Sequence, residues 1–167
     1  MGSINGDSAS KPNIKDSEGN LVVPCIIDGK PVIQPSSSNF PVTSARQEQV
    51  LHYGQNVTND LATKAVESAA NAFKTYKKTP VHERRKMLLR AAELFEQKAE
   101  ECIHRQMLET SCDIEWAKFN VFMNSECIRE IAGGVEAAVT GAVTSSHFGN
   151  TNLVFREPIG TALLIPP

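Results

Sequence analysis

The sequence lacks a dominant charge of either sign. Its 17 basic and 19 acidic residues give a formal net charge of -2. This balance excludes nucleic-acid or membrane-surface binding that depends on bulk electrostatics. Basic residues do cluster locally, but acids interleave with them or follow, which favours a solvated helix face over a phosphate-binding patch. The cluster comprises Lys74, Lys77, Lys78, Arg84, Arg85, Lys86 and Arg90.

Paired cysteines and grouped histidines are also missing. The cysteines show no Cys-x-x-Cys spacing and the histidines are scattered, so neither a zinc site nor a redox motif is indicated. We interpret the cysteines as reduced, inert thiols and the histidines as surface or capping residues rather than catalytic ones. They are Cys25, Cys102, Cys112 and Cys127, and His52, His82, His104 and His147.

No segment is typical of secretion or of a membrane span. Residues 1–20 are polar and contain no apolar signal-peptide core, and no stretch approaches the length of a membrane-spanning helix. A cytoplasmic protein is therefore predicted. Because residues 1–20 have too little apolar surface to offset the entropy lost on ordering, we expect them to form a disordered leader before a folded part at 21–167.

Two strand pairs are predicted after the leader. Apolar stretches at 22–27 and 31–33 flank Asp28-Gly29, a dipeptide that favours a tight hairpin turn. The mixed stretch from Asn39 to Tyr53 could add another pair of edge strands.

Helical periodicity follows, and it predicts three helices. Thr58 is a suitable N-cap for a helix ending near Lys78. Thr79-Pro80 then starts a second helix, which is expected to continue to Thr110. The third helix spans roughly 113–131 and has two apolar stripes, so it is either sandwiched in a core or walls a cavity. Gly133-Gly134 weakens the helical pattern near its end.

The C-terminal part reads as loop and strand. A loop is predicted at 140–150 and a half-exposed strand at 151–157, where apolar and polar residues alternate. The run from Thr161 to Ile165, closed by Pro166 and Pro167, is typical of a strand buried on both faces of a parallel sheet. Such a strand needs neighbours, so the chain is predicted to be the opening segment of a larger α/β domain.

Four segments in this order resemble the N-terminal part of the aldehyde dehydrogenase superfamily. They are His82 to Ala92, Glu109-Thr110, Ile131-Ala132-Gly133, and Arg156 to Gly160 with the terminal apolar run. Trp116-Ala117 and Phe119-Asn120-Val121 further resemble the branch that oxidises aromatic aldehydes such as vanillin and salicylaldehyde. The resemblance implies an α/β fold, with residues 21–167 forming an incomplete N-terminal, cofactor-binding domain of the Rossmann-like type with β-hairpins, three helices and terminal strands.

The resemblance also implies a chemistry and a set of site residues. Members of the family oxidise an aldehyde to a carboxylic acid with NAD or NADP, using a cysteine nucleophile, an oxyanion-binding asparagine and a glutamate base. The Pro-Trp-Asn motif that contains the asparagine would begin at Pro167, and the other catalytic motifs would lie beyond it, so no catalytic residue and no metal ligand is assigned in this chain. Ile165, Pro166 and Pro167 are expected to line the cofactor cleft. Phe119, Phe122 and Met123 are expected to line the substrate tunnel, with plain core packing as the alternative.

One position departs from the family pattern. Ser111 stands where the family usually has glycine after Glu-Thr, at a helix end where a left-handed residue is common. Serine there should cost about 1 kcal/mol or less relative to glycine.

Two functional hypotheses remain open at this stage. The first is a dehydrogenase segment that is inactive alone, with an aldehyde as the family's substrate and no nucleic-acid or membrane partner. The second is a non-catalytic interaction or oligomerisation protein that associates through exposed strand edges. A degraded gene product without function is a third reading.

Overall fold

An Asp-Gly turn shapes the first hairpin, as predicted. The computed structural model describes residues 14–44 and 46–166. Strand β1 (Cys25–Ile27) pairs antiparallel with β2 (Lys30–Val32). Both turn residues have positive φ, 52° at Asp28 and 70° at Gly29. A two-residue turn that follows the strand twist requires this geometry, and glycine adopts it without steric cost.

A second antiparallel pair follows, which confirms the prediction for residues 39–53. Strand β3 (Asn39–Ser44) pairs with β4 (Gln49–Gln55), with a register shift between Val42 and Thr43. A short 3-10 helix, η1 (Ser36–Ser38), precedes β3. Residues 14–20, which their composition assigned to a disordered leader, instead form a turn that leads into Val22, whose backbone bridges to β4 in parallel. Residues 1–13 lie outside the described part.

Helix α1 (Asn59–Tyr76) begins and ends close to the predicted limits. The Thr58 hydroxyl accepts a hydrogen bond from the Leu61 N–H at 3.2 Å, so the predicted N-cap is confirmed. Only Leu61 is buried, and Tyr76 is half exposed, because little of the described chain covers this helix.

The long second helix was predicted incorrectly and is two helices. Helix α2 (Val81–Gln97) starts directly after Pro80, as expected, but α3 (Ala99–Thr110) begins anew after Lys98. The Lys98 backbone, with φ -103° and ψ 14°, leaves the helical region and interrupts the hydrogen-bond ladder. Neither proline nor glycine marks this break in the sequence. Tertiary packing imposes it, since α3 packs against β3 while α2 is bound to α4.

Helix α4 (Ile114–Val139) extends eight residues beyond its predicted end at Ile131. Gly133 and Gly134 lie inside it, so the predicted weakening does not end the helix. Asp113 caps its start by accepting a hydrogen bond from the Trp116 N–H at 2.8 Å. One face of α4 is buried, through Ala117, Val121, Ser125 and Ala132.

The C-terminal part forms one hairpin and no further strand. Strand β5 (Ala142–Ser145) lies within the predicted loop and pairs antiparallel with β6 (Thr151–Val154), the core of the predicted strand at 151–157. The terminal run was expected to be a buried strand. Residues 161–166 have neither helix nor strand geometry and are exposed, because a strand forms only against a hydrogen-bonding neighbour and the described residues supply none.

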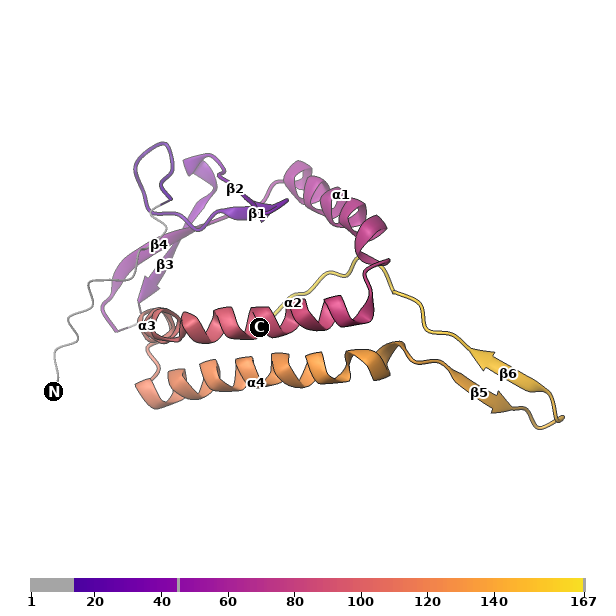
Figure 1. Ribbon diagram of the computed structural model, residues 1–167. Helices are drawn as coiled ribbons and strands as arrows, with labels where there is room; N and C mark the ends of the chain where they lie inside the picture. Colours follow the sequence, from indigo (N-terminus) through magenta and orange to yellow (C-terminus); the bar gives the residue numbers. More distant parts are fainter. Residues whose placement is uncertain (1–13, 45, 167) are drawn as a thin grey trace. The chain divides into compact units, whose positions relative to one another are not determined.

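The described residues thus contain four helices rather than three, together with three antiparallel strand pairs, in an α/β arrangement. They divide into two units. The first joins the residues up to Lys64 with Lys98–Phe119, and the second joins Ala65–Gln97 with the residues from Asn120 onward. Within the second unit, α2 and α4 lie side by side and the β5–β6 hairpin extends beyond the end of α4 (Figure 1). No helix in the described part is long and apolar enough to cross a membrane.

Candidate functional site

The three predicted tunnel residues lie on one exposed face of α4. Phe119, Phe122 and Met123 are spaced i, i+3, i+4, so they project from the same side of the helix. They are 50%, 60% and 38% exposed. Trp116 extends this face, with its ring centroid 5.7 Å from that of Phe119. These four side chains offer aromatic and apolar contacts only. Its assignment to a substrate tunnel stays a prediction.

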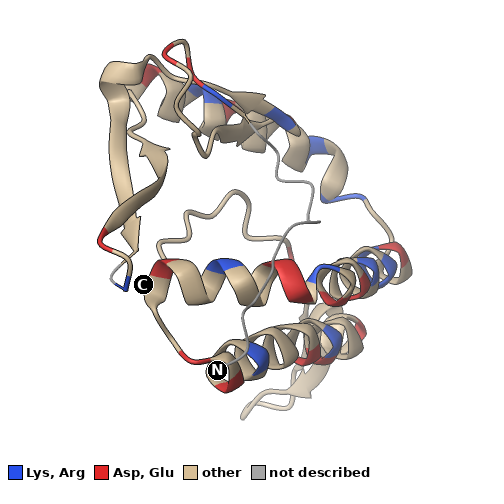
Figure 2. Ribbon diagram, turned by 90° about the vertical axis from the view of Figure 1, so that its left-hand side faces the viewer, with Lys and Arg blue, Asp and Glu red and all other residues tan. Residues whose placement is uncertain are grey.

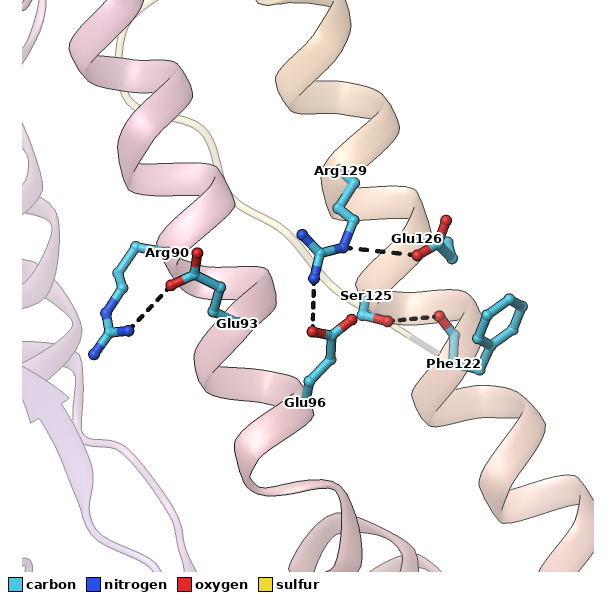
Figure 3. Close-up of polar contacts among 7 residues, drawn as sticks. All are labelled: Arg90, Glu93, Glu96, Phe122, Ser125, Glu126 and Arg129. Carbon is cyan, nitrogen blue, oxygen red and sulfur yellow. Dashed lines mark hydrogen bonds and ion pairs between the residues drawn. The ribbon is translucent and has the colours of Figure 1, made fainter.

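Helix α4 is held to α2 by a polar contact (Figure 3). Arg129 donates to the Glu96 carboxylate at 2.6 Å and lies 3.6 Å from Glu126. The hydrogen bond from Arg129 lowers the pKa of Glu96 and outweighs the opposing effect of burial, and Glu96 in turn raises the pKa of Arg129. Beside them the buried Ser125 hydroxyl donates to the Phe122 carbonyl at 2.8 Å. The ion pair between Arg129 and Glu96 thus links α4 to α2.

Two residues of the basic cluster pair with acids of the same helix, as the sequence indicated. Lys86 pairs with Glu83, and Arg90 pairs with Glu93. Arg84 donates to the carbonyls of Lys77 and Thr79 near the end of α1. Basic and acidic residues occur together on the helices (Figure 2). These contacts support a solvated helix face over a phosphate-binding patch.

The predicted cofactor residues lie in the extended terminal segment. Ile165 is 84% exposed and Pro166 is also exposed, while Pro167 lies outside the described residues. They can offer apolar and backbone contacts, and nothing in their geometry tests the cofactor assignment, which stays a prediction.

The Glu109–Thr110–Ser111 segment ends α3 as its motif suggested. Ser111 adopts the left-handed conformation, with φ 58° and ψ 20°. Its hydroxyl oxygen is buried and has no hydrogen-bond partner among the described residues. Glu109 lies 3.7 Å from the largely buried His52 of β4. His52 is therefore a packed residue between β4 and α3, where a surface or capping role was expected.

The cysteines and the potential metal ligands of the described residues do not form a reactive site. All four cysteines are free, and only Cys127 is exposed. In the described ranges, no three His, Cys, Asp or Glu side chains gather in a way that could hold a metal ion. A pocket of about 210 Å³ between the start of α2 and the end of α4 is lined by His82, Arg85, Glu136 and four apolar residues or glycine. It is smaller than the roughly 300 Å³ at which ligand pockets usually begin.

Sequence reasoning missed two polar contacts that hold the structure together. The Glu96–Arg129 contact joins residues 33 positions apart, and no periodic pattern relates them. Asp16, in a stretch predicted to be disordered, is only 8% exposed and accepts hydrogen bonds from Asn20 and Asn39. An Asp followed by Gly19-Asn20 is a local turn signal that could have found it.

The comparisons with known proteins agree with the resemblance found in the sequence. The model of the aldehyde dehydrogenase family matches residues 32–167. Salicylaldehyde dehydrogenase of Pseudomonas putida is 30% identical over 135 residues, which are 81% of this chain and 26% of that protein. Vanillin dehydrogenase of Pseudomonas sp. is 30% identical over 145 residues, 87% of this chain and 30% of that protein.

A solved structure shows the same similarity in three dimensions. The salicylaldehyde dehydrogenase from Pseudomonas putida G7, in complex with salicylaldehyde, aligns with a TM-score of 0.75 and 26% identity. The alignment covers 83% of this chain and 29% of that one. The chain thus spans between a quarter and a third of the length of these relatives. Because the family match covers most of the sequence, the chain belongs to the aldehyde dehydrogenase family.

Proposed function

We propose that this chain is the N-terminal, cofactor-domain portion of an NAD(P)-dependent dehydrogenase for aromatic aldehydes, and that residues 21–167 form this incomplete domain. The observation that supports the proposal most directly is the family match over residues 32–167, joined to 30% identity with salicylaldehyde and vanillin dehydrogenases. The exposed aromatic face of α4 is compatible with a planar aromatic substrate, since offset ring stacking needs such a surface.

In the complete reaction, the residues of this portion would bind and orient. Phe119, Phe122 and Met123 would form one apolar wall of the substrate tunnel, and Ile165, Pro166 and Pro167 would border the cofactor. NAD or NADP would accept the hydride. The nucleophile, the water-activating base and the oxyanion amide of the family have no counterpart in the motifs of these 167 residues. A cytoplasmic location is part of the proposal, and the four free cysteines fit a reducing compartment.

The first test concerns activity of the chain by itself. Purified chain incubated with NAD and vanillin or benzaldehyde should show no growth of NADH absorbance, because the sequence contains no family nucleophile motif. Reproducible turnover that is lost on cysteine alkylation would overturn the assignment of no catalytic residue to this chain.

A chimera tests the family role directly. Residues 32–167 would replace the matching segment of the Pseudomonas putida salicylaldehyde dehydrogenase, and salicylaldehyde-dependent NADH formation would be measured. Activity above that of the same enzyme lacking the segment supports the proposal. A folded chimera with no activity contradicts it.

A non-catalytic interaction protein is the second candidate. The observation that favours it is the extent of exposed apolar surface in the second unit, where Phe148, Phe155 and Ile159 are each at least 79% exposed. Apolar surface of this extent is typical of association. Size-exclusion chromatography with light scattering distinguishes the two, since a monomer at all concentrations argues against this role.

A further inference from the structure

A cluster of polar side chains joins α2 to α4 beside Phe122, and all of its members belong to the second unit. Arg129 Nη2 donates to Glu96 Oε2 at 2.6 Å, and Arg129 Nε lies 3.6 Å from Glu126 Oε1. The Ser125 hydroxyl donates to the Phe122 carbonyl at 2.8 Å, and Ser125 is only 2% exposed. Ser125 and Arg129 thus occupy the two helical turns that follow Phe122.

Glu96 of α2 interacts with two residues of this cluster on α4. Hydrogen bonds from Arg129 and, more weakly, from Ser125 lower the pKa of Glu96 against the opposing effect of burial. The carboxylate is therefore ionised at neutral pH, and hydrogen bonds to an ionised acceptor are stronger than neutral ones. One of the two partners of Glu96, Ser125, also holds the Phe122 carbonyl.

The ring of Phe122 points away from the cluster. The side chains of Glu96, Ser125 and Arg129 meet between the two helices, whereas the Phe122 ring lies on the side of α4 away from α2 (Figure 3). Phe122 is 60% exposed and its neighbour Met123 is 38% exposed. The cluster can therefore act on these two side chains through the backbone of α4, whose orientation it shares with them.

We propose that Glu96 is a positioning residue for the aromatic side of α4: through Arg129 and Ser125 it sets the orientation of Phe122, and so the fit of an aromatic aldehyde. This inference rests on the proposed function, because it takes Phe122 as part of the substrate tunnel wall. Glu96 itself touches neither substrate nor cofactor in this role. An apolar wall binds through close contacts, so a shift of about 1 Å is enough to weaken it.

The first measurement follows the aromatic side of α4 in the full chain. Glu96→Gln removes the charge and keeps the shape of the side chain. Glu83→Gln is the matched control, because Glu83 pairs with Lys86 inside α2. The NMR resonances of the Phe122 ring and of the Met123 methyl group should move in Glu96→Gln and keep their wild-type values in Glu83→Gln. Wild-type resonances in Glu96→Gln would overturn the positioning role.

The second measurement uses the chimera with the Pseudomonas putida salicylaldehyde dehydrogenase. Glu96→Gln should raise the KM for salicylaldehyde about fivefold and leave kcat unchanged, as expected when a partly exposed ion pair that affects only substrate binding is lost. Glu83→Gln should change neither constant. A lower kcat at unchanged KM would indicate a smaller folded fraction, which is a merely structural effect, and would overturn the proposal.

The two measurements separate this inference from the proposed function. An inactive wild-type chimera would overturn the proposed function and with it the effect on aldehyde binding, while the resonances of Phe122 and Met123 in the full chain would still decide the positioning role.

If Glu96→Gln does not fold, Ser125→Ala decides the question, because it removes the hydroxyl without adding volume. It should move the resonances of the Phe122 ring and the Met123 methyl group and raise the KM about twofold. Wild-type resonances and a wild-type KM in this variant would overturn the proposal.

Discussion

At the residue scale, Ser111 shows how a local departure from the family pattern is accommodated. A non-glycine residue with positive φ is strained by its Cβ atom, and here a buried hydroxyl without a partner adds to the cost. Local sequence allowed the conformation to be predicted, because the helix end was recognisable. The burial of the hydroxyl depends on neighbours and was not predictable.

Ser111→Gly should therefore stabilise the fold by about 1 kcal/mol, since glycine adopts positive φ without steric cost. Urea unfolding followed by circular dichroism measures this. Ser111→Ala is the matched control, because it removes the hydroxyl but keeps the Cβ atom. Equal stability of the glycine and alanine variants would show that the backbone strain contributes nothing.

At the element scale, two features depend on residues far apart in the sequence. They are the break between α2 and α3 and the pairing of α2 with α4. Neither is encoded in a periodic pattern. Lys98 has good helix propensity, so only the packing of the flanking helices against different partners explains the interruption. The cap at Thr58, by contrast, was predicted from the sequence, because a side-chain acceptor three residues before a helical N–H acts locally.

The Glu96–Arg129 contact predicts a pH dependence. The pKa of Glu96 is lower in the folded state than in the unfolded state. The ionised Glu96 therefore contributes its full stabilisation above the ordinary pKa of 4.5, and this stabilisation is lost as the pH falls through the lower pKa of the folded state. Both side chains are partly exposed, so the effect is modest.

The measurement is urea unfolding of the wild type and of Glu96→Gln at neutral pH and in acid. The stability difference should be present at neutral pH and shrink below about pH 4. Arg90→Gln, which breaks a pair within α2 alone, is the control and should not weaken the contact between the helices. A stability difference between the wild type and Glu96→Gln that is the same at neutral and acid pH would contradict the stabilising role of the Glu96–Arg129 contact.

Replacing Gly29 or Gly134 by alanine should change the stability of the fold in opposite directions. An added Cβ meets nothing within 4 Å at Gly29 or at Gly134, but only Gly29 has positive φ. Gly29→Ala should destabilise the β1–β2 hairpin by about 1 kcal/mol. Gly134→Ala should stabilise α4 by about 0.5–1 kcal/mol, since glycine is a poor helix former. Chemical unfolding compares the two, and shifts of the same sign would refute the conformational argument.

At the scale of the whole molecule, the described chain has little buried apolar surface. The buried apolar residues are small or few, namely Val22, Leu61, Ala92, Ala117, Val121 and Ala132. Three consecutive residues of the terminal segment, Leu163, Leu164 and Ile165, are 84–86% exposed. Burying such side chains is favourable by about 1.5–3 kcal/mol each, so the molecule has a strong tendency to cover them.

Replacing Leu163 and Leu164 by serine should reduce concentration-dependent association of the chain. The measurement is light scattering after size-exclusion chromatography. Val66→Ser removes an isolated exposed apolar residue of α1 and is the control, because single apolar residues on a surface seldom drive association. If both variants associate as the wild type does, the terminal segment has no part in it.

The sequence by itself determined the hairpin turn, the helix caps, the α/β class and the family, because each depends on residues close together or on an ordered set of motifs. Tertiary structure alone decided the break at Lys98, the exposure of the aromatic side of α4 and the hydrogen bond between Asp16 and Asn39. These features arise from contacts between segments distant in the chain, whose energies no local pattern contains. The terminal run shows the same principle, since an apolar sequence becomes a strand only when another strand accepts its hydrogen bonds.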